Sequence, residues 1–179
     1  MNLHFDMIKT TGYKSKSQIA RVATENWVSK NSYCPNCGEN NLNSYEGNKP
    51  VADFHCITCN EDYELKSKTG LLSKKIVDGA YSTMIQRITS DTNPNFFFLT
   101  YSPTQWVVND FLIIPKHFFT PEVIEKRKPL SINARRAGWI GCNIDLNHIP
   151  SLGRIFLIKE TKTVEKKGSI IKMEGHAFS

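Results

Sequence analysis

The chain has 179 residues and a mass of 20.4 kDa, with 40% hydrophobic and 22% charged residues. These proportions are typical of a soluble globular domain, and no stretch approaches the roughly 20 apolar residues of a membrane span. The net charge of +6 and the isoelectric point of about 9.1 weakly favour a polyanionic partner. The first residues lack the basic and apolar run of a signal peptide. We therefore expect a cytoplasmic protein, and we expect it to be a monomer.

The first expected element is a helix over residues 17–29. Ser15 to Gln18 has the spacing of a capping box, and apolar residues then recur at helical intervals. Glu25 falls on the more polar side of this helix. It is either an ordinary solvated carboxylate or an auxiliary carboxylate of an active site, and the helical pattern leaves both interpretations open.

The cysteines carry the clearest chemical signal. Four of the five form two Cys-x-x-Cys pairs separated by eighteen residues: Cys34 with Cys37, and Cys56 with Cys59. This spacing is typical of a structural zinc site, because four thiolates close the tetrahedral shell of one ion. Four unligated or catalytic thiols are the alternative. His4 and His55 could compete as ligands, but a complete cysteine set makes them unnecessary, and Cys142 is expected to be a small core residue.

Residues 50–56 and 62–66 alternate between polar and apolar side chains as strands do. The short turn at Cys56–Cys59 joins them into an antiparallel hairpin. If the hairpin has no bulge, Asp53 lies directly opposite Glu64, with Cβ atoms about 5 Å apart. Glu64 and Lys66 are two residues apart, so both project from the same face.

Asp53, Glu64 and Lys66 thus form a candidate catalytic site. Carboxylate oxygens are the ligands that Mg²⁺ prefers, and the Leu65 carbonyl is a plausible further ligand. A bound ion polarises a phosphodiester and lowers the pKa of its water, while a lysine offsets charge that develops on phosphorus. Ordinary cross-strand pairing of Glu64 with Lys66 on an exposed hairpin is the alternative, since the bare pattern is common. Its position on paired strands beside a zinc site favours the catalytic interpretation.

The rest of the chain alternates between helical and strand patterns. We expect a helix from Ser73 to Ile88 with an apolar stripe that packs in the core and implies no cofactor. The other expected elements are strands at 95–101 and 106–114, a short helix at 120–128, a loop at 129–138, and strands at 139–144 and 154–159. This order predicts an α/β fold with a mixed sheet flanked by helices, and a frayed terminus after Glu160.

Arg135, Arg136 and Trp139 lie in or next to the 129–138 loop. Arginines bind phosphates or guanine edges, and a tryptophan offers an apolar plate for a base or a methyl group. A solvated basic loop with a core tryptophan is the alternative, and locally the two are balanced. The lysine pairs at 74–75 and 166–167 are expected to serve solubility.

With these residues in view, the chain resembles the DpnI-type restriction endonucleases, which belong to the PD-(D/E)XK nuclease class. The resemblance runs from Leu3 to Leu157. The strings that carry it are Ser32-Tyr-Cys-Pro-Asn-Cys-Gly38, Pro50-Val-Ala-Asp53, Glu64-Leu-Lys-Ser-Lys68, Asp78-Gly-Ala-Tyr81, Asn93-Pro-Asn-Phe-Phe-Phe-Leu-Thr-Tyr101 and Ala134-Arg-Arg-Ala-Gly-Trp-Ile-Gly-Cys-Asn-Ile-Asp145. Strings this long are specific, unlike the bare Asp and Glu-x-Lys pattern.

The resemblance implies a methyl-directed enzyme of a restriction–modification system that cuts double-stranded DNA at GATC when the adenine carries an N6-methyl group. It implies catalytic Mg²⁺, a structural Zn²⁺, and catalytic roles for Asp53, Glu64 and Lys66. Trp139 matches a tryptophan implicated in sensing the methyl groups, which favours a DNA-binding role for Arg135, Arg136 and Trp139. Lys68, in the string that follows Glu64, is a further expected DNA contact.

The family pattern includes a C-terminal winged-helix domain, and no second recognition-helix pattern follows Lys159. We therefore expect residues 1–160 to form the catalytic domain with the zinc site, and residues 161–179 to form a basic tail. Two alternatives to the methyl-directed endonuclease stay open at this point. One is a zinc-stapled module that binds methylated DNA without cleaving it, and the other is a repair nuclease that uses the same site.

Overall fold

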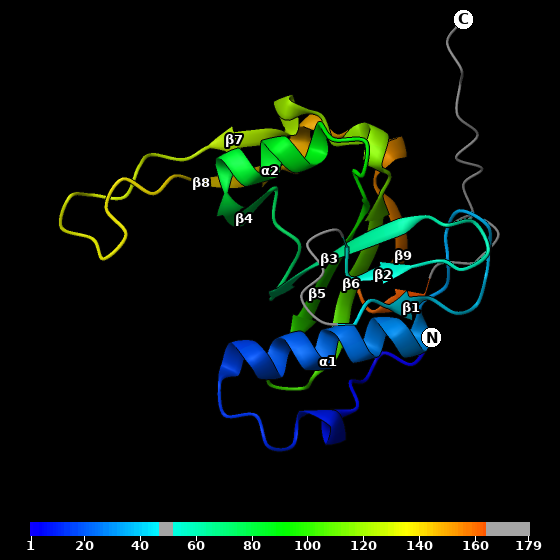
Figure 1. The fold of residues 1–179 in the computed structure, drawn as a ribbon. Helices are drawn as coiled ribbons and strands as arrows, with labels where there is room; N and C mark the ends of the chain where they lie inside the picture. The colour runs from blue at the N-terminus through cyan, green and yellow to red at the C-terminus, as the bar shows by residue number, and fades with distance from the viewer. Residues whose placement is uncertain (47–51, 164–179) are drawn as a thin grey trace, which may run out of the picture.

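The computed structural model describes residues 1–46 and 52–163 and contains a seven-stranded mixed sheet (Figure 1). Strand β3 runs parallel to β5, and the other neighbours in the sheet are antiparallel. This confirms the expected mixed α/β architecture. In order across the sheet, the strands are β1 (Asn43–Ser44), β2 (Phe54–His55), β3 (Asp62–Thr69), β5 (Asn95–Ser102), β6 (Val107–Ile114), β9 (Ile155–Lys159) and β10 (Lys162–Thr163).

Strands β5 and β6 form the middle of the sheet and are buried on both faces. Their near-continuous apolar runs follow from this position, because each face needs its own set of apolar side chains. Alternate residues serve two cores: Phe97 packs in the core that contains Trp27, and Phe98 packs in the core that contains Met84. The two central strands expected at 95–101 and 106–114 are confirmed.

Helix α1 (Lys16–Asn31) covers one face of the sheet. Trp27 of this helix is 1% exposed and meets the ring of Phe111 edge-on, with 5.2 Å between centroids. The helix expected at 17–29 is confirmed. The capping box is not: Ser15 is the N-cap residue, but its hydroxyl pairs with Ser17 and makes no capping bond.

A second, three-stranded antiparallel sheet and a short helix cover the other face (Figure 1). The strand order is β4 (Lys75–Ala80), β8 (Gly141–Asp145) and β7 (Ile124–Lys126), and α2 (Tyr81–Ile88) follows β4 directly. The strands expected at 139–144 and 154–159 correspond to β8 and β9. Cys142 on β8 is fully buried, as expected of a small core residue.

The helix expected from Ser73 to Ile88 is wrong for its first half. Residues 75–80 form strand β4, in which Ile76 is buried while Val77 is 66% exposed. A β-branched pair followed by Gly79 favours a strand over a helix interior. The apolar stripe therefore combines a strand face with a helix face, and both pack in the same core.

The helix expected at 120–128 is also wrong. Only a single 3-10 turn forms, η3 (Pro121–Val123), and the chain then extends as β7 because its backbone pairs with β8. The other 3-10 turns are η1 (Met7–Thr10), η2 (Lys116–Phe118), η4 (Leu146–His148) and η5 (Ser151–Gly153). The start of the expected first hairpin strand, at 50–51, and residues 164–179 of the expected tail lie outside the described residues. The terminus expected to fray after Glu160 is wrong for its first residues, because Lys162–Thr163 form β10 and pair with β9. None of the described helices is long and apolar enough to cross a membrane.

Phe97→Ala should lower the free energy of unfolding by about 3–5 kcal/mol, the usual cost of removing a buried phenylalanine. The ring stacks on Tyr63 and contacts Phe111, so its loss leaves a cavity beneath the hairpin. Urea denaturation measures the change. Leu152→Ala, at a site that is 88% exposed, is the control and should shift stability by no more than about 0.5 kcal/mol.

Candidate functional site

Both Cys-x-x-Cys pairs sit in turns of the same shape. In the first turn, Cys34 donates its N–H to the carbonyl of Glu39, and Gly38 donates to the carbonyl of Cys34, both at 2.8 Å. The second turn repeats the two bonds at 2.9 Å, from Cys56 and from Asn60. Gly38 and Asn60 occupy equivalent positions with φ of 82° and 59°. Glycine and asparagine tolerate this left-handed conformation best, which explains these two residues.

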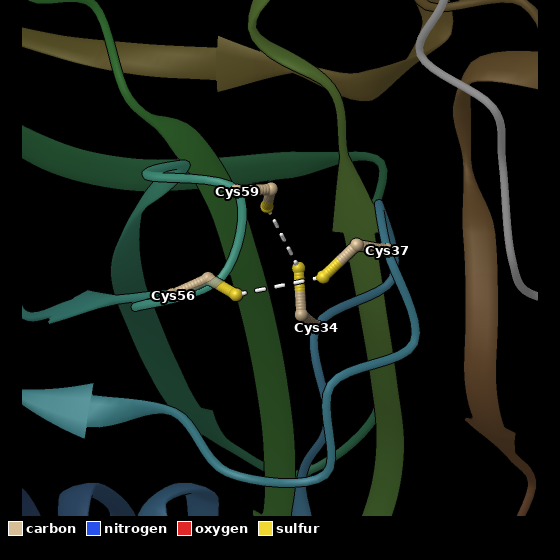
Figure 2. Close-up of side chains that lie close together, drawn as sticks. All are labelled: Cys34, Cys37, Cys56 and Cys59. Carbon is tan, nitrogen blue, oxygen red and sulfur yellow. Dashed lines mark hydrogen bonds between the residues drawn. The ribbon is translucent and has the colours of Figure 1, made fainter.

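The two turns face each other and bring four sulfur atoms together (Figure 2). All four Sγ atoms lie within 4.8 Å of one another, and Cys34 to Cys59 and Cys37 to Cys56 are each 3.6 Å apart. Four thiolates around one zinc ion would be about 3.8 Å apart, from the usual Zn–S distance of about 2.3 Å. The set therefore fits a structural zinc ion, as predicted. The cluster includes neither His4 nor His55.

The electrostatics of the sulfurs point the same way. Burial raises the pKa of the Cys34 thiol, and this outweighs hydrogen bonds to its sulfur from the backbone of Asn36 and Cys37. A bound cation would stabilise the thiolate form that burial disfavours. The Tyr63 hydroxyl also lies 3.1 Å from Cys34 Sγ, so the cluster is joined directly to strand β3.

The hairpin has the predicted register from Phe54 to the turn. Phe54 pairs with Tyr63 and His55 with Asp62, as predicted. The regular pairing ends there, because Asp53 donates its N–H to the carbonyl of Tyr63 at 3.0 Å, so the expected direct pairing of Asp53 with Glu64 does not form. Strand β2 begins at Phe54, so β3 has no described strand beside it on that side after Tyr63. The Asp53 carboxylate occupies this open edge, where its Oδ2 accepts a 2.7 Å hydrogen bond from the N–H of Leu65. Burial raises the pKa of the Asp53 carboxyl, and the charges of Glu64 and Glu25 add to the effect.

Glu64 and Lys66 project from the same face of β3, as predicted, and belong to a chain of four charged groups. Lys66 Nζ lies 2.7 Å from Glu64 Oε1 and 2.9 Å from Asp78 Oδ2, and Arg87 Nε lies 2.7 Å from Glu64 Oε2. Burial alone would lower the pKa of Lys66, but the charges of Glu64 and Asp78 hold it above its ordinary value. Sequence reasoning gave no role to Asp78 or Arg87, because it placed both on one continuous helix.

A cavity of about 490 Å³ opens between helix α1 and the edge of β3. Asp53 and Glu64 line it from the hairpin side, and Glu25 lines it from the helix, where it pairs with Arg21 at 2.7 Å. Lys68 lines the same cavity further along β3. The structure therefore brings Glu25 and Lys68 to the same cavity as Asp53 and Glu64, and a cation in this cavity would lie among carboxylates.

The loop between β7 and β8 extends away from the two sheets, as the yellow segment in Figure 1 shows. Its base is a continuation of the β7–β8 hairpin, since Leu130 donates its N–H to the carbonyl of Trp139 at 2.9 Å. We call residues 127–140 the arm. Arg135 and Arg136 are exposed on it, and the Arg136 guanidinium lies 4.4 Å from the Trp139 ring centroid. Trp139 belongs to neither hydrophobic core of the described chain, so it is not a core residue.

Trp139 lines a second cavity of about 650 Å³ at the root of the arm. Tyr81 and Ile85 of α2 form the opposite wall, and Lys126 of β7 also lines it. Gly141 allows the indole to approach the strand closely, because a Cβ there would come within 2.8 Å of the ring. The predicted DNA-binding residues thus lie together on the arm, apart from Lys68, which lies on β3 beside the first cavity.

Comparison with protein families gives one match that spans almost the whole chain. The family model described as DpnI, Dam-replacing family, matches residues 1–177. The chain belongs to the Dam-replacing family. Membership implies a restriction endonuclease that acts on DNA. In this Dam-replacing family protein, the two cavities and the four-cysteine cluster are the candidate parts of a site that acts on DNA.

Purified Cys56→Ala should contain no bound zinc, whereas wild-type protein and Cys142→Ala should each retain one ion per chain. Four sulfurs complete the shell and Cys142 is not one of them, so only the first variant breaks it. Metal analysis and a thiol-reactive release assay measure the content. Wild-type protein that carries no zinc after purification would contradict the assignment. Because structural zinc contributes folding free energy, Cys56→Ala should also unfold at lower temperature.

Proposed function

We propose that the chain is a methyl-directed endonuclease of the PD-(D/E)XK class. In this proposal it hydrolyses phosphodiester bonds of double-stranded DNA at GATC sites that carry N6-methyladenine, with Mg²⁺ as the catalytic ion. The observation that carries the proposal is the meeting of Asp53, Glu64 and Lys66 at the open edge of β3. An aspartate followed, on the paired strand, by Glu-x-Lys is the arrangement for which the class is named.

The residues at this edge fit a hard divalent cation. Asp53 and Glu64 would hold it, with the Leu65 carbonyl as a further ligand. The repulsion that the charges of Glu64 and Glu25 exert on Asp53 supports this assignment, because a cation among these carboxylates would relieve it. When bound, Mg²⁺ polarises the phosphodiester and lowers the pKa of a coordinated water. Glu25 lines the same cavity and supports the role of auxiliary carboxylate.

Lys66 contributes a positioned positive charge. Its ammonium group is held between Glu64 and Asp78, and their charges keep it protonated at neutral pH. In the proposal it donates a hydrogen bond that orients the attacking water or steadies the charge that develops on the phosphate. Lys68 lines the cavity two residues further along the strand and would contact the DNA backbone.

The arm supports recognition of the DNA. Between Glu125 and Asp145 the sequence has no acidic residue and five basic ones. Arg135 and Arg136 would bind phosphates or base edges, and Trp139 would provide the apolar surface for the methyl groups. The exposure of both arginines and the cavity beside Trp139 support this division of roles.

A second candidate is a module that binds methylated DNA without cutting it. One observation favours it: both oxygens of Glu64 already have cationic partners, Lys66 and Arg87. A carboxylate oxygen can accept more than one partner, so this does not exclude a metal ion. Cleavage in Mg²⁺ separates the two candidates, and cleavage without any dependence on methylation would favour a repair nuclease instead.

Incubation with plasmid in Mg²⁺ should cut DNA grown with adenine methylation and spare the unmethylated form. Glu64→Ala and Lys66→Ala should each slow cutting by at least about 100-fold, because each removes a group that acts in the reaction. Both variants should keep their zinc. Lys74→Ala, an exposed lysine nearby, is the matched control and should cut as wild type does. Failure of wild-type protein to cut either plasmid in Mg²⁺ or Mn²⁺ would overturn the enzymatic proposal.

Trp139→Ala should reduce the preference for methylated over unmethylated duplex, while Arg135→Ala should weaken binding to both. Removing one phosphate contact should lower the slope of log affinity against log salt by about 1, whereas removing the tryptophan should leave it unchanged. Fluorescence anisotropy in Ca²⁺ at several salt concentrations measures both effects. A wild-type affinity that does not respond to salt would speak against DNA as the ligand.

A further inference from the structure

The charged groups at Glu64 and Lys66 come from two parts of the fold: the large sheet, and the segment that runs from the small sheet into helix α2. Strand β3 of the large sheet supplies Glu64 and Lys66, and the continuous segment from β4 through α2 supplies Asp78 and Arg87. The four side chains form an unbroken series: Asp78 to Lys66 at 2.9 Å, Lys66 to Glu64 at 2.7 Å, and Glu64 to Arg87 at 2.7 Å. Their exposed fractions are only 17–21%, so solvent screens these pairs weakly.

A backbone irregularity next to Asp78 accompanies the contact of its carboxylate with Lys66. The pairing of β4 with β8 shifts register between Asp78 and Ala80, which is a bulge at Gly79. Bulges redirect side chains and recur beside active sites. Helix α2 begins immediately afterwards at Tyr81, and its last turn carries Arg87. The segment from β4 through α2 therefore contacts Lys66 through Asp78 of its strand and Glu64 through Arg87 of its helix.

The same segment is bonded to the root of the arm. Asp78 lies opposite Cys142 in the β4–β8 pairing, and Tyr81 donates its N–H to the carbonyl of Ile140 at 3.1 Å. Trp139 is the next residue along the arm and shares a cavity with Tyr81. A displacement of the arm root on contact with DNA would therefore move strand β4, which pairs with β8, and would change the position of Asp78 beside Lys66.

We propose that Asp78 and Arg87 are positioning residues, which hold Lys66 and Glu64 in place for cleavage and link them to the DNA-reading arm. The inference rests on the proposed function and deepens it. Asp78 is a second carboxylate bound to the ammonium group of Lys66, in addition to Glu64, so that the group is restrained by two partners. Arg87 fixes the second oxygen of Glu64, so the carboxylate is oriented before a cation arrives. Such orientation matters because a small misplacement of reacting groups can cost about 100-fold in rate.

The two ends of the series should act oppositely on cation binding. Asp78→Asn removes a negative charge near the site and leaves Lys66 to pair with Glu64 alone. Mg²⁺ should then bind more weakly, on the order of fivefold. Arg87→Gln removes a cation that competes for Glu64, so Mg²⁺ should bind more tightly by a similar factor. Both variants should nevertheless cut more slowly, because each loses the orientation of one reacting group.

The experiment uses full-length, zinc-loaded protein and two measurements. Thermal unfolding across a Mg²⁺ titration gives cation affinity without DNA, and single-turnover cleavage of methylated duplex gives the rate. Glu125→Gln is the matched control, since it breaks an exposed ion pair between Lys75 and Glu125 in the same small sheet. Its cation affinity and cleavage rate should equal those of wild type. Glu64→Gln reports any binding of Mg²⁺ elsewhere on the protein.

Opposite shifts in cation affinity together with slower cleavage in both variants would support the proposal. If both variants only lose thermal stability and otherwise match Glu125→Gln, the groups are structural and the proposal is wrong. Wild-type protein that fails to cut would overturn the proposed function itself, which separates the two failures. For the link to the arm, Asp78→Asn combined with Trp139→Ala should slow cleavage by less than the product of the single effects. If the double variant slows cleavage by the full product of the two single effects, Asp78 and Trp139 act independently and the link to the arm is excluded.

Discussion

The alignment of the candidate catalytic groups depends on the four-cysteine cluster. Strand β2 has only two residues, and a hairpin so short is marginal by itself in water. The turn at Cys56–Cys59 forms the end of this hairpin, and its sulfurs meet those of the turn that follows helix α1. Tying the two turns together fixes the hairpin against the helix. Asp53 and Glu64 then line one cavity together with Glu25 of the helix.

The two candidate metal sites differ in chemistry and in role. The cluster offers four soft sulfurs, which suit zinc, and the open edge of β3 offers carboxylate and carbonyl oxygens, which suit a hard ion such as magnesium. Tyr63 stands between them in the chain: its hydroxyl contacts Cys34, and the next residue is Glu64. The ring of Tyr63 also stacks on Phe97 of the central strand, with 4.7 Å between centroids. The hydrophobic core thus supports the residue that connects the two sites.

Local patterns in the sequence were sufficient for part of this arrangement. The cysteine spacing, the hairpin register from Phe54 to the turn and the two central strands could all be predicted, because each depends on neighbours within a few residues or on simple alternation. Strand β4 could not, since its pairing partner β8 lies more than sixty residues away and its apolar residues also fit a helical stripe. Asp78 and Arg87 were missed for the same reason. On one helix they would have no defined relation to Lys66, and only the contact between the sheets reveals it.

The open edge of β3 has a further consequence for the behaviour of the protein in solution. After Tyr63, this strand presents backbone groups with no described strand beside them on one side, and such edges are templates for association between chains. Lys66 and Lys68 project from this stretch, and a lysine on an edge strand discourages another strand from pairing there. Lys66 and Lys68, proposed to serve DNA cleavage, would therefore also protect the folded chain against aggregation. Their replacement by apolar residues would reduce both catalysis and solubility.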